Sequence, residues 1–281
     1  MSLEAPDVER WSERVTVVRG LNPGPFTGPG TNTYLVGTGP RPFLIDTGSG
    51  KSGYVPLLAG ALAEREQQPG EILLTHVHPD HIGGVADILG AYGPRKVYKK
   101  FWPEKDALYD FPLEEIAHDD VFHTDGATLR AIYTPGHARD HICFFLEEER
   151  AIFTGDVVLG AGTTVISQDG GDMKDYFNTL EHLLKLAPDR IYPGHGPAID
   201  DATPRLAAYL EHRLERERQI LRTLSDGPLA VTEMVKRIYV DTPVELHPAA
   251  GMSVLSHLTK LEAESRVKAS GNPKRDAWAL T

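Results

Sequence analysis

Residues 75–81, Thr75-His76-Val77-His78-Pro79-Asp80-His81, bring together four side chains that can bind a metal ion. They follow directly on the apolar run Ile72–Leu74, so they lie at the end of a predicted strand. In an extended segment alternate side chains point to the same side, so the imidazoles of His76 and His78 can meet one ion. The carboxylate and the imidazole after the proline lie past the bend and can reach a second ion a few ångströms away. The segment therefore predicts a two-metal site rather than a polar loop with surface histidines.

Three further fragments each set a ligand-capable residue at the end of an apolar strand. They are Thr134-Pro135-Gly136-His137, Thr154-Gly155-Asp156 and Tyr192-Pro193-Gly194-His195. The glycine in each fragment lets the chain turn sharply, so that the next side chain can face inward. A single fragment of this kind is more often an ordinary turn. Together with residues 75–81, the three predict that seven side chains converge on one metal centre.

Strands and helices are interspersed along the first 200 residues. Strands are predicted at 15–18, 32–36, 42–45, 71–75, 129–133, 142–146, 151–154 and 190–192, and helices at 56–66, 82–89 and 173–186. The signals weaken between Arg95 and His123, where we expect an irregular insertion. This order of elements favours a layered α/β (α+β) fold.

The composition changes near Pro204, where a long helix rich in charged residues is predicted over 204–224. Helices at 231–239 and 252–264 and short strands at 266–269 and 276–280 follow it, which is the order of a winged helix. The segment from 204 holds 12 basic and 10 acidic residues, so the acidic balance lies before it. We expect a catalytic domain at 1–203 and a winged-helix-like domain at 204–281. The long helix could also serve a homodimer.

The 281 residues have the composition of a globular protein that is large enough for a sizeable core. The formal net charge of -11 repels polyanions over most of the surface. No apolar run approaches the roughly 20 residues of a membrane-spanning helix, and the first residues are acidic where a targeting signal would be basic. We therefore expect a cytoplasmic protein without membrane association. The single cysteine, Cys143, lies in an apolar run and is predicted to be a core residue.

With these motifs, about the first 200 residues resemble the metallo-β-lactamase superfamily. The resemblance implies a four-layer αββα sandwich with two metal ions at one edge of its two sheets. It implies a first metal site of His76, His78 and His137, a second site of Asp80, His81 and His195, and Asp156 as the bridge between them. Asp80 would also act in catalysis by orienting its metal and assisting proton transfer.

Two more residues matter through the same resemblance. Asp46 matches a family position that orients ligands from behind, and His141 is either a packed structural histidine or a partner of the ligands. Imidazole and carboxylate ligands without a thiolate suit two Zn²⁺ ions, although Mn²⁺ or Fe²⁺ would also fit. The flavodiiron oxidoreductases of the superfamily have Glu where this chain has His78, which disfavours a redox role.

Segments outside the ligands resemble the β-lactamase-like protein 2 family nearly end to end. They include Asn22-Pro23-Gly24-Pro25, residues 30–37, residues 160–165 and residues 191–197. The animal members imply cleavage of single-stranded RNA, and the fungal members imply release of polyketide acids from acyl carrier protein.

An RNA phosphodiester is the first interpretation, because the basic residues Arg95, Lys96, Lys99 and Lys100 could contact phosphates beside aromatic side chains. The alternative is an acyl thioester, cleaved by a polyketide-carrier or glyoxalase II-like thioesterase, and the acidic balance favours it. A β-lactamase, a persulfide dioxygenase and a non-catalytic winged-helix binding module rank lower.

Overall fold

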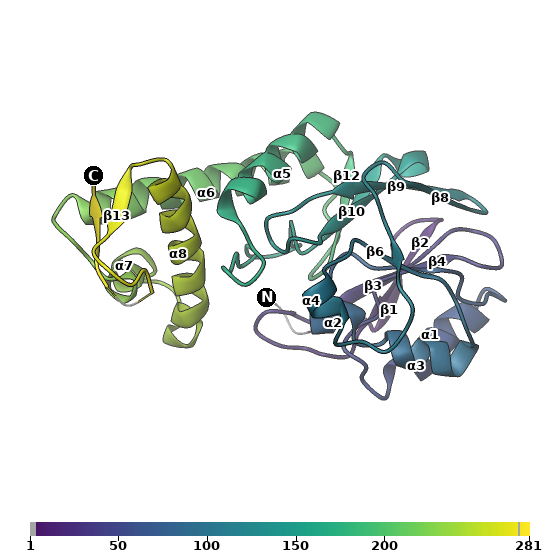
Figure 1. Ribbon diagram of the computed structural model, residues 1–281. Coiled ribbons are helices and arrows are strands. Elements are labelled where there is room, and N and C mark those ends of the chain that lie inside the picture. The colour runs from purple at the N-terminus through teal and green to yellow at the C-terminus, as the bar shows by residue number, and fades with distance from the viewer. Residues whose placement is uncertain (1–3, 275) are drawn as a thin grey trace. The chain divides into compact units, whose positions relative to one another are not determined.

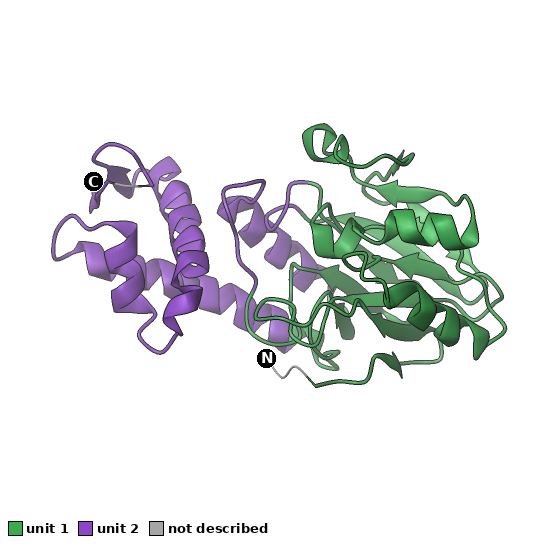
Figure 2. Cartoon of the chain, turned by 90° about the horizontal axis from the view of Figure 1, so that it is seen from below, with its two compact units in different colours: residues 1–134, 140–163, 187–203 green, residues 135–139, 164–186, 204–281 purple. Residues whose placement is uncertain are grey.

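The computed structural model describes residues 4–274 and 276–281 (Figure 1). The chain divides into two compact units (Figure 2). Unit 1 comprises residues 1–134, 140–163 and 187–203, and unit 2 comprises residues 135–139, 164–186 and 204–281. Each unit has its own hydrophobic core, and each is described by itself below.

The first sheet of unit 1 contains seven strands in chain order. They are β1 (Val8–Arg10), β2 (Val15–Arg19), β3 (Asn32–Val36), β4 (Phe43–Ile45), β5 (Ile72–Leu73), β6 (Val97–Lys99) and β7 (Glu114–Glu115). Strands β1 to β4 pair antiparallel, and β4 to β7 pair parallel, so the sheet is mixed.

The second sheet of unit 1 contains five strands in the order β12-β11-β10-β9-β8. Their bounds are β8 (Val121–Thr124), β9 (Ala127–Tyr133), β10 (Ile142–Leu146), β11 (Ala151–Gly155) and β12 (Arg190–Pro193). Only β11 and β12 pair parallel. The inner faces of the two sheets share one core, in which Val17 and Tyr34 of the first sheet cluster with Phe144 and Phe153 of the second.

Two helices cover the outer face of the first sheet, α1 (Tyr54–Ala63) and α3 (Val85–Tyr92) (Figure 1). Their buried residues Leu58 and Ile88 belong to the cluster that includes Leu44 of β4. Short helical turns complete the unit at α2 (Pro79–Ile82), α4 (Pro103–Asp106) and η1 (Glu147–Glu149). The expected end of the 82–89 helix before Gly90 is wrong, because α3 continues through this glycine to Tyr92.

Unit 2 contains the remaining helices and a small hairpin. Its elements are α5 (Met173–Leu186), α6 (Ala202–Leu224), α7 (Val231–Ile238), η2 (Val244–Leu246), α8 (His247–Ala263), β13 (Val267–Ala269) and β14 (Trp278–Leu280). A core of Ile220, Met234, Val254 and Trp278 joins α6, α7, α8 and the hairpin. None of the helices among the described residues is long and apolar enough to cross a membrane.

The sequence predicts an irregular insertion from Arg95 to His123, and this prediction is wrong. This stretch contributes β6 and β7 to the first sheet and the start of β8 to the second. The pattern was obscured because Lys99, which lies on the same face of β6 as Val97, is fully buried. Its ammonium group lies 2.7 Å from Asp106 and 2.8 Å from Asp140, so a charged residue fills a position where a strand usually has an apolar one.

Candidate metal centre

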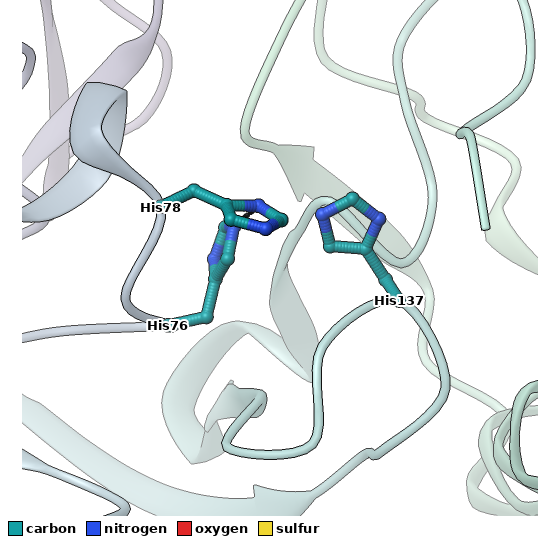
Figure 3. Close-up of side chains that lie close together, drawn as sticks. All are labelled: His76, His78 and His137. Atoms are coloured by element: carbon teal, nitrogen blue, oxygen red, sulfur yellow. Dashed lines mark hydrogen bonds between the residues drawn. The ribbon is translucent and has the colours of Figure 1, made fainter. Parts of the chain in front are cut away.

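Three groups of His and Asp side chains lie close enough together to hold metal ions. They are His76, His78 and His137; His76, His81 and Asp156; and Asp80, His81 and His195, and within each group the ligand atoms lie within 4.8 Å of one another. Figure 3 shows the ring of His137 facing those of His76 and His78. All seven residues that the sequence singled out as ligands are therefore members of these groups.

The spacing of the donor atoms fits a metal ion of the size of zinc. His195 Nε2 lies 3.3 Å from Asp80 Oδ2 and 3.2 Å from Asp156 Oδ1, and His81 Nε2 lies 3.3 Å from the same Asp156 oxygen. Ligands about 2.0 Å from a tetrahedral ion stand about 3.3 Å apart. The Nε2 atom of His81 is buried and has no hydrogen-bond partner in the described part of the chain, which fits a metal ligand better than a hydrogen-bonding side chain.

The turn after β5 sets the direction of the first ligands. His78 is extended, with φ -60° and ψ 142°, and Pro79 starts the short helix α2 directly after it. Because proline is favoured at the first position of a helix, the chain changes there from extended to helical geometry. His76 and His78 thus share one side, with 2.9 Å between His76 Nε2 and His78 Nδ1, while Asp80 and His81 lie on the helical turn.

Asp46 orients two histidines at once. Its Oδ2 accepts hydrogen bonds from His81 Nδ1 at 2.7 Å and from the hydroxyl of Thr75 at 2.8 Å, and its Oδ1 accepts the backbone N–H of Thr75. The Thr75 hydroxyl in turn lies 2.9 Å from His76 Nδ1, which donates to it because the hydroxyl hydrogen is already used. Both histidines therefore use Nδ1 as a hydrogen-bond donor and direct Nε2 towards the metal groups.

His137 is oriented in a similar way by its own loop. Its Nδ1 lies 3.0 Å from the carbonyl oxygen of Val165 and 3.0 Å from the hydroxyl of Thr164. Because a carbonyl can only accept, Nδ1 carries the hydrogen and Nε2 carries the lone pair. Arg213 of α6 donates a hydrogen bond of 2.6 Å to the Thr164 carbonyl and so fixes the segment that holds His137.

Glycines and His141 make room for Asp156 and hold it. A Cβ atom at Gly194 would lie 2.5 Å from Asp156 Oδ1, so only glycine allows the close approach of the carboxylate. His141 is fully buried, and its Nε2 accepts the backbone N–H of Asp156 at 3.2 Å. Of the two roles left open for His141, this contact favours that of a partner of the ligands.

Two residues where β3 begins, Thr31 and Asn32, support the centre without any signal in the sequence pattern. The hydroxyl of Thr31 donates to Asp80 Oδ2 at 3.0 Å, and the side-chain amide of Asn32 donates to the carbonyl oxygens of Pro193 and Gly196 at 2.8 Å each. The amide thus holds the backbone on both sides of His195. Both residues lie in the stretch 30–37 that carries the resemblance to the β-lactamase-like protein 2 family, which was the one available hint.

The carboxylates and imidazoles shift one another's pKa. Burial lowers the pKa of His195, but Asp156 and Asp80 raise it to about 9. His81 behaves alike, because the pull of Asp80, Asp156 and Asp46 exceeds the effect of burial and raises its pKa. Burial lowers the pKa of His76, and its histidine neighbours lower it further. At neutral pH, His76 is therefore ready to bind a cation, whereas an ion must displace protons from His81 and His195.

The basic side chains between Arg95 and Lys100 are engaged within the protein. Lys99 is fully buried between two carboxylates, so its interpretation as a phosphate contact is wrong. Lys100 pairs with Glu115 at 2.7 Å, Lys96 lies 3.7 Å from Glu114, and Arg95 donates to the carbonyl oxygens of Pro69 and Gly93. The segment does not offer a set of unpaired cations to a nucleic acid.

Comparisons with known proteins agree with this geometry. Residues 26–195 match the Metallo-beta-lactamase superfamily, and residues 230–278 match the Beta-lactamase associated winged helix domain. A Beta-lactamase-like protein 2 homolog of Caenorhabditis elegans is 40% identical over 259 residues, which span 90% of this chain and 86% of that protein. An Atrochrysone carboxyl ACP thioesterase of Aspergillus chevalieri is 40% identical over 257 residues, 87% of this chain and 79% of that protein.

Solved structures show the same fold. A metallo-beta-lactamase family protein of Thermus thermophilus superimposes with a TM-score of 0.81 at 24% identity, over 97% of this chain and 100% of that one. A protein solved in a di-iron-bound form superimposes with a TM-score of 0.53 at 30% identity, over 68% of this chain and 95% of that one. The expected fold, a metallo-β-lactamase sandwich with a winged-helix domain after it, is confirmed, and both of its sheets are mixed. With a matching profile over most of its length and His and Asp groups typical of a two-metal site, the chain belongs to the metallo-beta-lactamase superfamily.

Proposed function

We propose that this member of the superfamily hydrolyses acyl thioesters at a centre of two divalent metal ions, with zinc as the first candidate. The observation that carries the proposal is the convergence of three His and Asp groups whose donor atoms have the spacing of ligands around an ion. Imidazole and carboxylate donors without a thiolate suit zinc, and manganese or iron remain alternatives for the test.

Two bound metal ions would lower the pKa of a coordinated water to about 7 and polarise the bond to be cleaved. The protein provides the ligands and their orientation. His76, His78 and His137 form one ligand set, Asp80, His81 and His195 form the other, and Asp156 lies 3.3 Å or less from nitrogen atoms of His81 and His195. This position suits a bridge between the two sets.

Asp80 is the proposed catalytic carboxylate. Its side chain is 27% exposed, more than that of Asp156 at 14%, so it can meet a water molecule or a substrate atom. The hydroxyl of Thr31 donates to Oδ2 and leaves Oδ1 for a second contact. We therefore assign to Asp80 both a metal contact and the transfer of a proton from water to the leaving group.

The charge of the chain supports a thioester over RNA as the substrate. The net charge is -11, and the basic side chains near residue 100 are buried or paired, whereas phosphate binding depends on available positive charge. A relative that is 40% identical over 87% of the chain is named an acyl carrier protein thioesterase. A neutral acyl thioester would not be repelled by the acidic surface.

Single-stranded RNA is the second candidate. The observation in its favour is the match of residues 230–278 to a winged helix domain, a fold that can bind nucleic acids, in a unit whose charge is nearly balanced. The similarity to Beta-lactamase-like protein 2 homologs extends over this domain as well. Binding of RNA would then rest on unit 2 and on the metal ions rather than on the segment around Lys99.

A parallel assay separates the two substrates. The protein is loaded with zinc, manganese or iron, and its turnover is measured on short and long acyl thioesters and on a single-stranded RNA. We expect thioester hydrolysis that is lost in His76→Ala and in Asp156→Ala. Each variant removes one ligand and should leave the sandwich folded, which circular dichroism checks. RNA cleavage without thioester hydrolysis would replace the first candidate by the second, and full activity of the double variant would refute metal catalysis.

A further inference from the structure

Arg19 is a buried cation whose guanidinium has no acidic partner among the residues that the structure describes. It ends β2, its side chain is almost completely buried at 2% exposure, and its Nε and Nη1 atoms have no hydrogen-bond partner among residues 4–274 and 276–281. No carboxylate of that part of the chain lies within 4 Å of it. The ring of Trp11 lies against it, with its centroid 5.4 Å from the guanidinium carbon.

Such an arrangement is rare in a folded protein. A guanidinium stays charged at physiological pH and has five N–H donors, and a buried charge normally has a partner that compensates for the lost water. Here burial lowers the pKa of Arg19, and the charge interactions with Tyr34, Glu9 and Asp7 oppose this effect without cancelling it. The Trp11 ring offers its face to the cation but accepts none of the N–H groups as an oxyanion would.

Arg19 lines a cavity of about 510 Å³, within the size range of small-molecule sites. The cavity belongs to unit 1 and is not part of the metal centre, since none of the seven metal-binding residues lines it. Its apolar walls come from Trp11, Pro29, Ala161, Pro197 and Ala198. A second arginine, Arg190, also lines it but is already paired with Asp200 at 2.9 Å.

We propose that this cavity binds a small organic monocarboxylate, whose carboxylate pairs with the guanidinium of Arg19 and whose apolar body lies against Trp11 and the prolines. The planar fork of a guanidinium matches the two oxygens of a carboxylate. Three exposed acids, Glu4, Glu9 and Asp200, also line the cavity and repel anions of higher charge, so a monocarboxylate fits better than a phosphate.

The site does not depend on the proposed hydrolysis. It could hold a regulatory ligand or the acid product of a neighbouring reaction, and both have the same chemistry. Gly196, which lines the cavity, directly follows His195 in the sequence, so one wall of the cavity adjoins a residue of the candidate metal centre. A ligand in the cavity could change the turnover of the enzyme, but the binding itself can be measured without any activity assay.

The test is isothermal titration of the metal-loaded protein with benzoate, with neutral benzamide and inorganic phosphate as comparison ligands. We expect saturable binding of benzoate and at least tenfold weaker binding of benzamide and phosphate. Arg19→Met should weaken benzoate binding at least tenfold, whereas Arg130→Met should leave it within twofold. Arg130 is the matched control because it is a strand arginine of unit 1 that pairs with Glu147 at 2.7 Å.

Both variants keep the metal centre, so benzoate that bound to the metal ions would bind Arg19→Met and Arg130→Met equally well. Equal affinity of the two variants for benzoate therefore overturns the proposal. No saturation by benzoate overturns it too, and tighter binding of phosphate than of benzoate overturns the ligand class.

Thermal melting of the ligand-free protein separates binding from folding. Arg19→Met should melt no lower than the parent, because an unpaired buried charge is removed. If it melts lower, Arg19→Lys decides: it keeps the charge but not the planar fork, and unchanged benzoate affinity in this variant also overturns the proposal.

Discussion

Asp46 Oδ2 accepts the hydrogen bond of His81 Nδ1 at 2.7 Å, and both side chains are almost completely buried. The backbone of Asp46 has a φ of 56°, a left-handed conformation that aspartate and asparagine tolerate better than most other residues. The tight turn after β4 and the orientation of the metal-binding histidines thus depend on the same residue.

Asp46→Asn separates these two roles, because asparagine keeps the left-handed turn and loses one accepting oxygen. The variant should fold, but its single amide oxygen cannot replace both Oδ1, which accepts the Thr75 backbone N–H, and Oδ2, which accepts from His81 and the Thr75 hydroxyl. We expect the affinity for metal to fall about 10- to 100-fold, as found for other partners of metal-bound histidines. Competition with a coloured chelator measures the affinity. Asp87→Asn, which changes an exposed acid of α3, is the control, and equal affinities of the two variants would contradict the role of Asp46.

Metal binding should strengthen as the pH rises from 6 to 9. The pKa of His195 in the metal-free protein is raised to about 9 by Asp156 and Asp80, so this imidazole holds a proton at neutral pH. A metal ion must displace that proton, and each proton released makes the affinity change about tenfold per pH unit below the pKa. Calorimetry in buffers with different ionisation enthalpies counts the protons. Zinc binding at pH 7 without proton release would show that the carboxylates do not act in this way.

Lys99→Met should destabilise unit 1 strongly, because it leaves the carboxylates of Asp106 and Asp140 buried without their common cation. Removal of one partner from a buried ion pair costs about 3–5 kcal/mol. Denaturation in urea measures the free energy of unfolding. Lys96→Met is the matched control on the same strand segment, because this lysine is exposed and 3.7 Å from its acid, and little change is expected there. Similar stabilities of the two variants would contradict the structural role of Lys99.

Cys143 should be inert to thiol reagents in the native protein. It is fully buried in β10, where burial raises the pKa of its thiol to about 12, and its Sγ accepts the hydroxyl hydrogen of Thr134. Since the thiolate is the reactive form, labelling at pH 8 should proceed only as fast as the protein unfolds. The urea-unfolded chain should react at once with one equivalent. Rapid labelling of the folded protein would show that this strand opens.

The residues of the three His and Asp groups could be singled out from the sequence because their signals are local. His76, His78, Asp80 and His81 follow one another within a single turn, and each later ligand follows an apolar strand and a glycine. The strands themselves were predictable where the apolar pattern was continuous, as over Ile142–Leu146, whose bounds agree with β10.

Apart from those of Asp46 and His141, which the family resemblance indicated, the contacts around these residues could not be predicted, because they join distant parts of the chain. The amide of Asn32 reaches a carbonyl 161 positions away, and no periodic pattern marks such a pair. Lys99 misled the interpretation in another way. A lysine is rarely buried, so the sequence favours a position on the surface for this side chain. The two carboxylates of Asp106 and Asp140, which are visible only in the structure, explain why it is buried.

The order of the ligands along the chain has a consequence for biosynthesis. Each of the three groups needs at least one residue that follows position 133, namely His137, Asp156 or His195. A nascent chain that has emerged from the ribosome only as far as β9 can therefore present histidines to an ion but cannot enclose it. Loading of the full centre must wait until His195 has been translated and has left the exit tunnel, when most of the first sheet has already had time to form.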